Sequence, residues 1–431
     1  RVSPAPGAAD VTIEVREILG PEIVSFEASE YEISGMGTTW DNGDPVKLEW
    51  AALNATSYSL EQTSGPSVVT GIPSGATGET GAVLDFPANT TLESRSFRFT
   101  LSAFGDDSTS ADTYELVISQ LPMYREAGAA INTTVRPGIT HSLADEVWFS
   151  GAHHLYRRTA TGDVQSFALG SSGAMPIDLA FDESRSTVWI VSEEGGSLVR
   201  FEVGTEEFSY FPLPLQGNEV RALAVAIDGD GYVWVGARVD GSGRGNYLLR
   251  FDPEAQTFTE EALLDHQVFN IDSLAVDDDG IIWITLNQTL HHVDSRDITN
   301  RGTAEIGGHL VDLTVGPSGD LWVLDLTGNK VYRLSADPRD VGVRATIGLS
   351  GQPRGITVVD GRVWVTIGST RQLSVIDPGS NRVTSFSTPT FRKGDTSSGF
   401  PLSVVGWNSH EGPRLYFVDE FANELVQVLL E

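Results

Sequence analysis

An aromatic residue between β-branched or aliphatic neighbours recurs through the last two thirds of this 431-residue chain, as in "TVWIV", "IIWIT" and "RVWVT". Successive copies lie 39 to 52 residues apart. A self-similar period of roughly 20–50 residues is typical of repeat architectures, in which one small unit recurs and buries its apolar face against its neighbours. The recurring residues are Trp148, Trp189, Trp234, Trp283, Trp322, Trp364 and Tyr416.

The sequence around each recurring aromatic residue predicts four short strands. An alternating strand and a polar turn precede it, as in "SLAVDDDGIIWIT", and two further strands follow, as in "YLLRFDP" and "RVTSFST". Four strands in about 40–50 residues predict one blade of a β-propeller. Seven units fit between Gly138 and Glu431. The last unit reaches only three strands, so we expect residues 123–135 to supply its outer strand and close the ring.

The acidic stretch "DDDG" at residues 277–280 has two further interpretations, a calcium loop and a catalytic acid cluster. A calcium loop needs more oxygen ligands at fixed offsets, and the following "IIWIT" supplies none. In sibling repeats the same place holds "DGDG" and "PSGD", where aspartate and glycine suit the backbone of a tight hairpin. We therefore predict a turn between the first two strands of the unit.

The first third of the chain predicts a different domain. Alternating strands such as "VKLEWAAL", "SFRFTLSAF" and "TYELVIS" are separated by Gly, Ser and Asp turns. They fit one small β-sandwich over residues 21–121, and we expect Trp50, Phe97, Phe99 and Leu101 to face its interior. The predicted fold class is thus all-β: an immunoglobulin-like β-sandwich at 21–121, followed by a seven-bladed β-propeller at 122–431.

Residues 1–20 are predicted to form an extended strand or linker. "GAADVTIEV" resembles "TSADTYELVI", the last strand of the predicted sandwich. One interpretation is the final strand of a preceding sandwich, either cut from a longer tandem array or paired with an incomplete sheet in another subunit. The other is a first strand of the visible sandwich. The candidate assembly residues are Val11, Ile13, Val15 and Ile18.

The repeats, with units such as "QPRGITVVDGRVWVTIGSTRQLSVIDP", resemble the seven-bladed propellers of the virginiamycin B lyase and NHL-like superfamily. The preceding domain resembles immunoglobulin-like modules of bacterial surface proteins. The lyase resemblance implies catalysis by histidine and glutamate near the central channel, beside a bound Mg²⁺. Here none of the residues three positions after the recurring aromatics is glutamate, and the family's histidine in "PHGI" falls on Arg354. We therefore predict no catalytic residue, metal site or cofactor.

Composition narrows the range of partners. The formal net charge is −31, from 28 basic and 59 acidic side chains, which disfavours nucleic acid and anionic membranes because their phosphates would be repelled. No apolar run approaches the roughly 20 residues needed to cross a bilayer. There is no cysteine, and the amino terminus lacks the regions of a signal peptide. We expect an extracellular or cell-surface protein, secreted with a leader that is absent from this sequence.

Polar residues at the predicted starts of the innermost strands form the candidate ligand site. In a propeller these starts converge at one mouth of the axial channel, the usual ligand-binding face. They are candidates to hold a sugar-like or peptide ligand, or else they pair with one another and with water to satisfy the channel lining. His266 and His309 lie in loops leading to the same mouth. The six candidates are Asp178, Arg221, Asp272, Asp312, Arg354 and Ser403.

Together these patterns predict a non-catalytic binding or structural protein. The expected partner is a protein or glycan at the cell surface, with self-association through the first strand making the chain a subunit of a larger assembly. The alternative is a lyase or hydrolase that acts on a polar ligand at the channel mouth.

Overall fold

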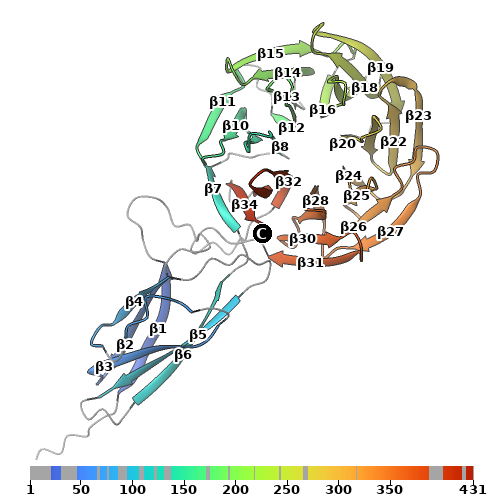
Figure 1. Cartoon of the computed structure of the whole chain (residues 1–431). Coiled ribbons are helices and arrows are strands. Elements are labelled where there is room, and N and C mark those ends of the chain that lie inside the picture. The colour runs from blue at the N-terminus through green and yellow to red at the C-terminus, as the bar shows by residue number, and fades with distance from the viewer. Residues whose placement is uncertain are drawn as a thin grey trace, which may run out of the picture. The chain divides into compact units, whose positions relative to one another are not determined.

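The structure is a computed structural model in which every described regular element is a β-strand (Figure 1). The described residues are 21–30, 46–65, 68–74, 77–85, 95–105, 111–120, 124–130, 137–170, 175–192, 195–217, 219–241, 244–265, 270–316, 318–387, 401–419 and 424–430. The predicted assembly residues Val11, Ile13, Val15 and Ile18, and also His266, lie outside them. The chain divides into two compact units.

The first unit consists of two three-stranded antiparallel sheets. Apolar side chains from both sheets form one buried cluster, because alternate residues of each strand face the same side. The residues predicted to face inward, Trp50, Phe97, Phe99 and Leu101, all belong to it. One sheet has the order β1 (Glu22–Glu30), β2 (Val46–Leu53), β4 (Gly81–Leu84), and the other β3 (Ser57–Ser64), β5 (Arg95–Phe104), β6 (Ala111–Gln120).

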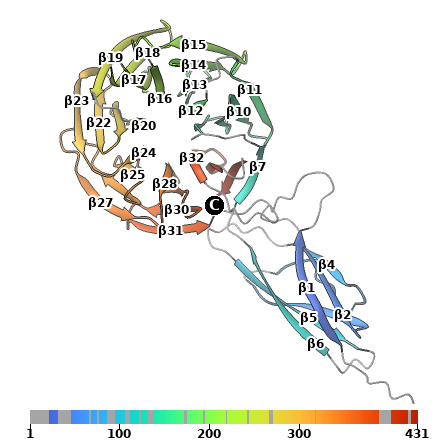
Figure 2. The same cartoon turned by 180° about the vertical axis from the view of Figure 1, so that it is seen from behind.

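The second unit contains seven four-stranded antiparallel sheets among its described residues. They follow one another around a ring in chain order, and Figure 2 shows the same ring from behind. In each sheet the strand that precedes the recurring aromatic residue lies innermost, and successive inner strands contact one another. The all-β, propeller-type fold predicted from the aromatic period is confirmed.

The strand bounds of these sheets, each from the inner to the outer strand, are as follows. The first three sheets are β8 (Ile139–His141), β9 (Val147–Gly151), β10 (His154–Arg158), β11 (Val164–Ala168); β12 (Pro176–Asp182), β13 (Thr187–Ser192), β14 (Ser197–Glu202), β15 (Glu207–Pro212); and β16 (Glu219–Ile227), β17 (Val233–Asp240), β18 (Gly245–Asp252), β19 (Thr257–Asp265). The next two are β20 (Ile271–Val276), β21 (Ile281–Leu286), β22 (Thr289–Asp294), β23 (Asp297–Glu305); and β24 (Leu310–Val315), β25 (Leu321–Asp325), β26 (Lys330–Leu334), β27 (Val343–Gly348). The last two are β28 (Pro353–Val359), β29 (Arg362–Ile367), β30 (Gln372–Asp377), β31 (Arg382–Ser387); and β32 (Pro401–Ser409), β33 (Gly412–Asp419), β34 (Glu424–Leu429), β7 (Tyr124–Ala130).

The recurring aromatic residues lie on the second strand of each sheet, and all seven are buried. Three of the tryptophans each lie under an arginine side chain of the third strand, at the directly opposite position of the ladder. A guanidinium over an indole adds electrostatic attraction to the packing, about 0.5–2 kcal/mol depending on desolvation. The pairs are Arg157 over Trp148 at 5.4 Å, Arg250 over Trp234 at 5.9 Å and Arg333 over Trp322 at 5.3 Å.

The stretch "DDDG" is the hairpin turn between β20 and β21, as predicted. One Asp277 carboxylate oxygen accepts hydrogen bonds from the amides of Asp279 and Ile281, at 3.0 and 2.8 Å. The other oxygen accepts one from Trp283 Nε1 at 2.8 Å. Gly280 has a φ of 79°, which glycine adopts without steric cost. Asp277 therefore fixes the turn and satisfies the buried indole.

The ring closes between segments from the two ends of the second unit. β7 pairs antiparallel with β34 and is the fourth strand of the last sheet. On the inner side of this seam, the ring of His141 stacks on Trp407, with centroids 4.5 Å apart and planes 3° from parallel. Trp407 Nε1 also donates to Asp145 Oδ1 at 3.1 Å. The seam is thus made by main-chain pairing, aromatic stacking and a buried hydrogen bond together.

Candidate functional site

Six inner strands share an irregularity near their start that sets which side chains reach the channel. As in β32, the register with the second strand shifts by one residue in β12, β16, β20, β24 and β28, the pattern of a β-bulge. A one-residue shift moves later side chains to the opposite face of a strand. The extra residue is Ile177, Leu223, Asp272, Val311 and Arg354, respectively.

The residue after the bulge connects neighbouring sheets in two places. Each inner strand is the edge of its sheet, so half of its amides lack a partner within that sheet. Asp178, just after the bulge in β12, accepts a hydrogen bond from its neighbour Leu179 N at 2.9 Å. Its other oxygen accepts one from Val225 N, on the next inner strand, also at 2.9 Å. Asp178 therefore satisfies a free edge amide and ties two sheets together.

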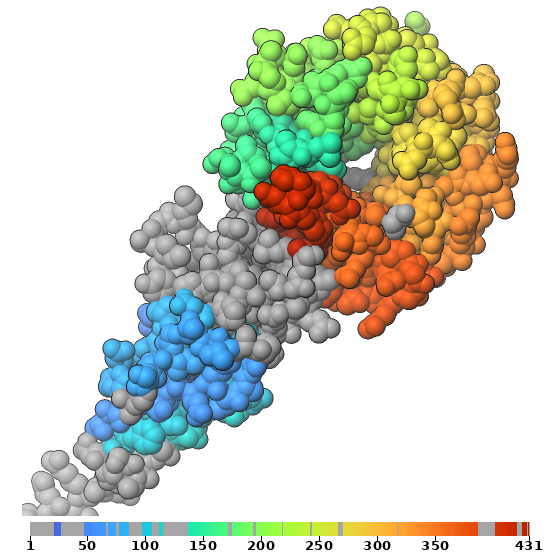
Figure 3. Space-filling view, viewed as in Figure 1, coloured from blue at the N-terminus to red at the C-terminus, as the bar shows by residue number. Residues whose placement is uncertain are grey.

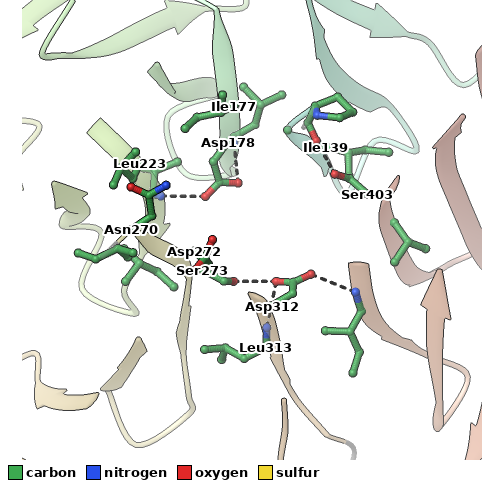
Figure 4. Close-up of a pocket in the computed structure, with 18 residues that line it drawn as sticks. Ile139, Ile177, Asp178, Leu223, Asn270, Asp272, Ser273, Asp312, Leu313 and Ser403 are labelled. Atoms are coloured by element: carbon green, nitrogen blue, oxygen red, sulfur yellow. Dashed lines mark hydrogen bonds between the residues drawn. The ribbon is translucent and has the colours of Figure 1, made fainter. Parts of the chain in front are cut away.

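Asp312 repeats this arrangement three sheets further along the ring (Figure 4). One carboxylate oxygen accepts from Leu313 N at 2.9 Å and from Ser273 Oγ, on the preceding inner strand, at 2.7 Å. The second accepts from Ile356 N, on the following inner strand, at 3.0 Å. Asp312 thereby connects three consecutive sheets.

Hydroxyl groups make the corresponding connections at other sheet boundaries. Ser403 Oγ donates to Pro137 O across the closing seam. Ser150 and Thr366, two residues after their recurring tryptophans, donate to Pro176 O and Leu402 O of the following sheets. Neighbouring inner strands are therefore joined by short polar side chains that hydrogen-bond to main-chain groups, which fixes the strands relative to one another.

A cavity of about 320 Å³ lies among the inner strands, and the space-filling view shows the ring hollowed at its centre (Figure 3). All seven inner strands contribute an aliphatic residue to its lining at the same position. These residues are Ile139, Leu179, Val225, Leu274, Leu313, Ile356 and Val404. The cavity is therefore the axial channel of the ring, with polar groups added from particular sheets.

Four of the six predicted ligand residues line this cavity, namely Asp178, Asp272, Asp312 and Ser403. Arg221 and Arg354 are not among its lining residues. The register explains the position of Arg221, which precedes the bulge of β16 by two residues. Its guanidinium bonds to Glu219 Oε1, at 3.1 Å from Nε and 2.5 Å from Nη2.

A histidine and a carboxylate approach each other at the rim of the cavity. His309 Nε2 lies 3.6 Å from Asp272 Oδ2, across the boundary between the fourth and fifth sheets. The histidine side chain is 40% exposed and that of Asp272 is 18% exposed. Asp325 fixes the main chain here, since its Oδ1 accepts from His309 N at 3.0 Å and from Gly328 N at 2.9 Å. Burial alone would raise the pKa of Asp325, but these amide hydrogen bonds lower it overall.

Sequence reasoning missed two polar residues of the lining, Ser273 and Asn270. Ser273 occupies the same register as Asp178 and Asp312, directly after the bulge. Asn270 precedes its inner strand as His309 precedes β24, and its Oδ1 accepts from Arg238 Nη1 at 2.6 Å. Ser273 lies 10 residues before Trp283, as Asp312 lies 10 before Trp322, and Asn270 lies 13 before Trp283, as His309 lies 13 before Trp322. Alignment of the repeats on the recurring tryptophan would therefore have found both.

The arrangement of acidic groups bears on metal binding. Within the described ranges, no three His, Asp or Glu side chains come together in a group able to hold a metal ion.

No helix of the described part of the chain is long and apolar enough to cross a membrane.

Replacement of Asp312 by alanine is expected to destabilise the ring. The substitution leaves Ile356 N, Leu313 N and Ser273 Oγ without their acceptor, at a cost of about 1–3 kcal/mol for each group that water does not reach. We expect the free energy of unfolding to fall by about 2–4 kcal/mol, measured by urea denaturation. The matched control is Asp278→Ala, at an exposed position of the β20–β21 turn. Equal losses in the two variants would contradict the bridging role of Asp312.

Comparisons with known proteins support the fold. No family model matches the sequence, and no curated protein matches it. A structure of streptogramin B lyase is similar with a TM-score of 0.60 and 17% identity, over 72% of this chain and 97% of that chain. A catalytically inactive virginiamycin B lyase from Staphylococcus aureus, in a structure with quinupristin, gives 0.58 and 17% over 72% and 99%. A chain of a mitotic checkpoint complex gives 0.57 and 14% over 72% and 92%. At these identities the likeness is one of fold: this chain contains a β-propeller similar to that of the virginiamycin B lyases.

Proposed function

We propose that this chain is a non-catalytic binding or structural protein of an extracellular or cell-surface setting. In this proposal an immunoglobulin-like module precedes a seven-bladed propeller, and the axial cavity binds a small polar ligand. Two sheets packed around one apolar core support the module, and seven four-stranded sheets closed by β7 support the blade number. The expected partner is a protein or glycan at the cell surface.

A binding role is supported by the hydrogen bonds that the carboxylates of the cavity already accept. Asp178 and Asp312 each accept hydrogen bonds from main-chain amides of their own and the following sheet. A general acid or base must approach a reacting proton and exchange it. Carboxylates held by several amides are instead fixed acceptors, and such groups orient a ligand without reacting with it.

Ligand binding is tested by calorimetric titration of the full chain with a panel of monosaccharides, oligosaccharides and short peptides. The proposal expects at least one class to bind in the axial cavity and to lose affinity in Asp272→Asn. Asp278→Asn, outside the cavity, is the matched control. Binding that both variants leave unchanged would place the ligand elsewhere.

Self-association through residues 1–20 is the structural part of this proposal. Its support is the alternating apolar pattern of Val11, Ile13 and Val15, which suits pairing with a sheet edge in another subunit. Ile13→Asp combined with Val15→Asp is expected to abolish assembly of the full chain, because the charges would be buried without partners. Thr12→Asp, which lies out of phase with this alternation in the sequence, is the control. Light scattering over a concentration series decides, and an unchanged mass in the double variant would refute the connector role.

A lyase or hydrolase acting at the cavity is the second candidate, favoured by the 3.6 Å approach of His309 to Asp272. A histidine beside a carboxylate is a common general-base arrangement. This candidate would be selected if the chain turns over a bound sugar or peptide, and if His309→Gln abolishes the turnover but not the binding.

A further inference from the structure

The wall of the axial cavity holds two aliphatic residues and one carboxylate at equivalent positions of three successive inner strands. Ile177, Leu223 and Asp272 are the extra residues of the bulges in β12, β16 and β20, and all three line the cavity. These inner strands are consecutive neighbours in the ring. Ile177, Leu223 and Asp272 thus hold equivalent positions on three successive strands, and Figure 4 shows all three around the opening.

The charged groups around this wall are of one sign among the described lining residues. Asp178, Asp272 and Asp312 line the cavity, and no described lysine or arginine does. Asp178 and Asp312 are held in place by main-chain amides, so the positions of their carboxyl groups in the wall are fixed. Asp272 differs from them because it faces the half-exposed imidazole of His309 at 3.6 Å, an ion pair only when the histidine is protonated.

We infer that the axial cavity binds an aliphatic cation, with an ammonium or guanidinium group on Asp272 and its hydrocarbon stem on Ile177 and Leu223. This inference rests on the proposed function, in which the cavity binds a ligand. A carboxylate in a concave, partly dry wall attracts a cation more strongly than it would in open water. The adjacent aliphatic side chains stabilise the stem by removing apolar surface from water.

The size of the cavity limits the ligand. About 320 Å³ is near the lower end of small-molecule pockets. It fits a lysine-like or arginine-like side chain, or a short free amine, rather than a folded segment. Both sources present the same chemistry, and the experiment distinguishes them.

The test is isothermal titration of the full chain with four probes at low ionic strength. Nα-acetyl-lysine methylamide supplies the cation and the stem, and its norleucine counterpart keeps the stem without the charge. Cadaverine represents a free amine, and a lysine-containing pentapeptide represents a partner protein. We expect the lysine probe to bind at least about tenfold more tightly than the norleucine probe. Tighter binding of cadaverine would identify free amines as the source, and tighter binding of the pentapeptide a protein.

Substitutions then locate the site. Asp272→Asn is expected to weaken the lysine probe at least about tenfold, because it removes the charge and keeps the shape. Asp278→Asn should change the affinity less than about twofold, since an exposed charge is screened by water and salt. Melting curves check that both variants are folded. The comparison of the lysine probe with the norleucine probe uses the unaltered chain, so it does not depend on the folding of any variant.

Each contrary result has a distinct meaning. Equal affinity for the lysine and norleucine probes, or binding of neutral sugars without binding of amines, overturns the cationic ligand and leaves the proposed binding function standing. Lysine binding that Asp272→Asn does not weaken overturns the assignment of the site. Absence of binding by all amines, sugars and peptides up to about 10 mM, an affinity too weak to be specific, overturns both.

Discussion

Acidification from about pH 6.5 to about pH 4 is expected to remove about 3 kcal/mol of stability from the second unit through His291. This side chain lies on β22 and is only 6% exposed. Burial lowers its pKa from 6.5 to about 4, against an opposing effect of Asp265. The unfolded chain therefore binds a proton in this window that the folded chain does not, and stability falls as the pH falls.

The neighbours of His291 indicate how to isolate its effect. Its ring nitrogens lie 3.1 Å from Thr289 Oγ1 and 3.0 Å from Thr303 Oγ1, contacts that an amide side chain can also make. His291→Gln should therefore flatten the dependence of the unfolding free energy on pH, whatever its cost at neutral pH. His410→Gln is the control, because that side chain is 78% exposed. Urea denaturation across the window measures both, and an unchanged slope in His291→Gln would exclude this histidine as the source.

Trp234→Ala is expected to lower the unfolding free energy by about 3–5 kcal/mol, because it leaves a large cavity in a closely packed interior. The indole is fully buried and packs in a cluster that spans the third and fourth sheets. Its Nε1 donates to Asp228 Oδ2 at 2.8 Å. Alanine therefore removes both the packing and the partner of a buried carboxylate. Guanidinium denaturation, with circular dichroism to confirm the folded state, provides the measurement.

A comparison of two tryptophans separates packing from hydrogen bonding. Trp364 holds the equivalent place in the sixth sheet, but its Nε1 has no hydrogen-bond partner among the described residues. Phenylalanine keeps most of the aromatic volume at either position. Trp234→Phe should cost about 1–3 kcal/mol more than Trp364→Phe, since only the former leaves an acceptor unpaired. Equal costs would show that the Asp228 hydrogen bond contributes nothing to stability.

The recurring tryptophan predicted the propeller from sequence because its cause is local. Each repeat must bury one large side chain on a strand of period two, and a polar turn must return the chain, so the pattern is visible within about 15 residues. The turn at Asp277 was predictable for the same reason, since the Asp277 carboxylate accepts hydrogen bonds from three groups that all lie within the next six residues.

The candidate site was only partly predictable, because its geometry depends on contacts distant in sequence. The carboxylate of Asp178 reaches Val225, and that of Asp312 reaches Ile356, on neighbouring sheets. The bulge that sets the register leaves no residue signature, as it falls on Ile177, Asp272 and Arg354 alike. Arg221 was therefore predicted to line the channel, whereas its side chain bonds to Glu219 outside the lining. Ser273, which does line the channel, was not predicted.

The pairing of β7 with β34 also has a consequence for folding during synthesis. β7 is the first strand of the second unit to leave the ribosome, and its partner is the last. Until β34 emerges, β7 has no partner strand in the last sheet, although β32 can already contact β8 on the inner side of the seam. Long-range pairing of this kind is slow to form and prone to aggregation. Synthesis of β34 is therefore the event that joins β7 to the last sheet, and a premature stop just before it would leave two unpaired strand edges, on β33 and on β7, rather than a slightly shorter protein.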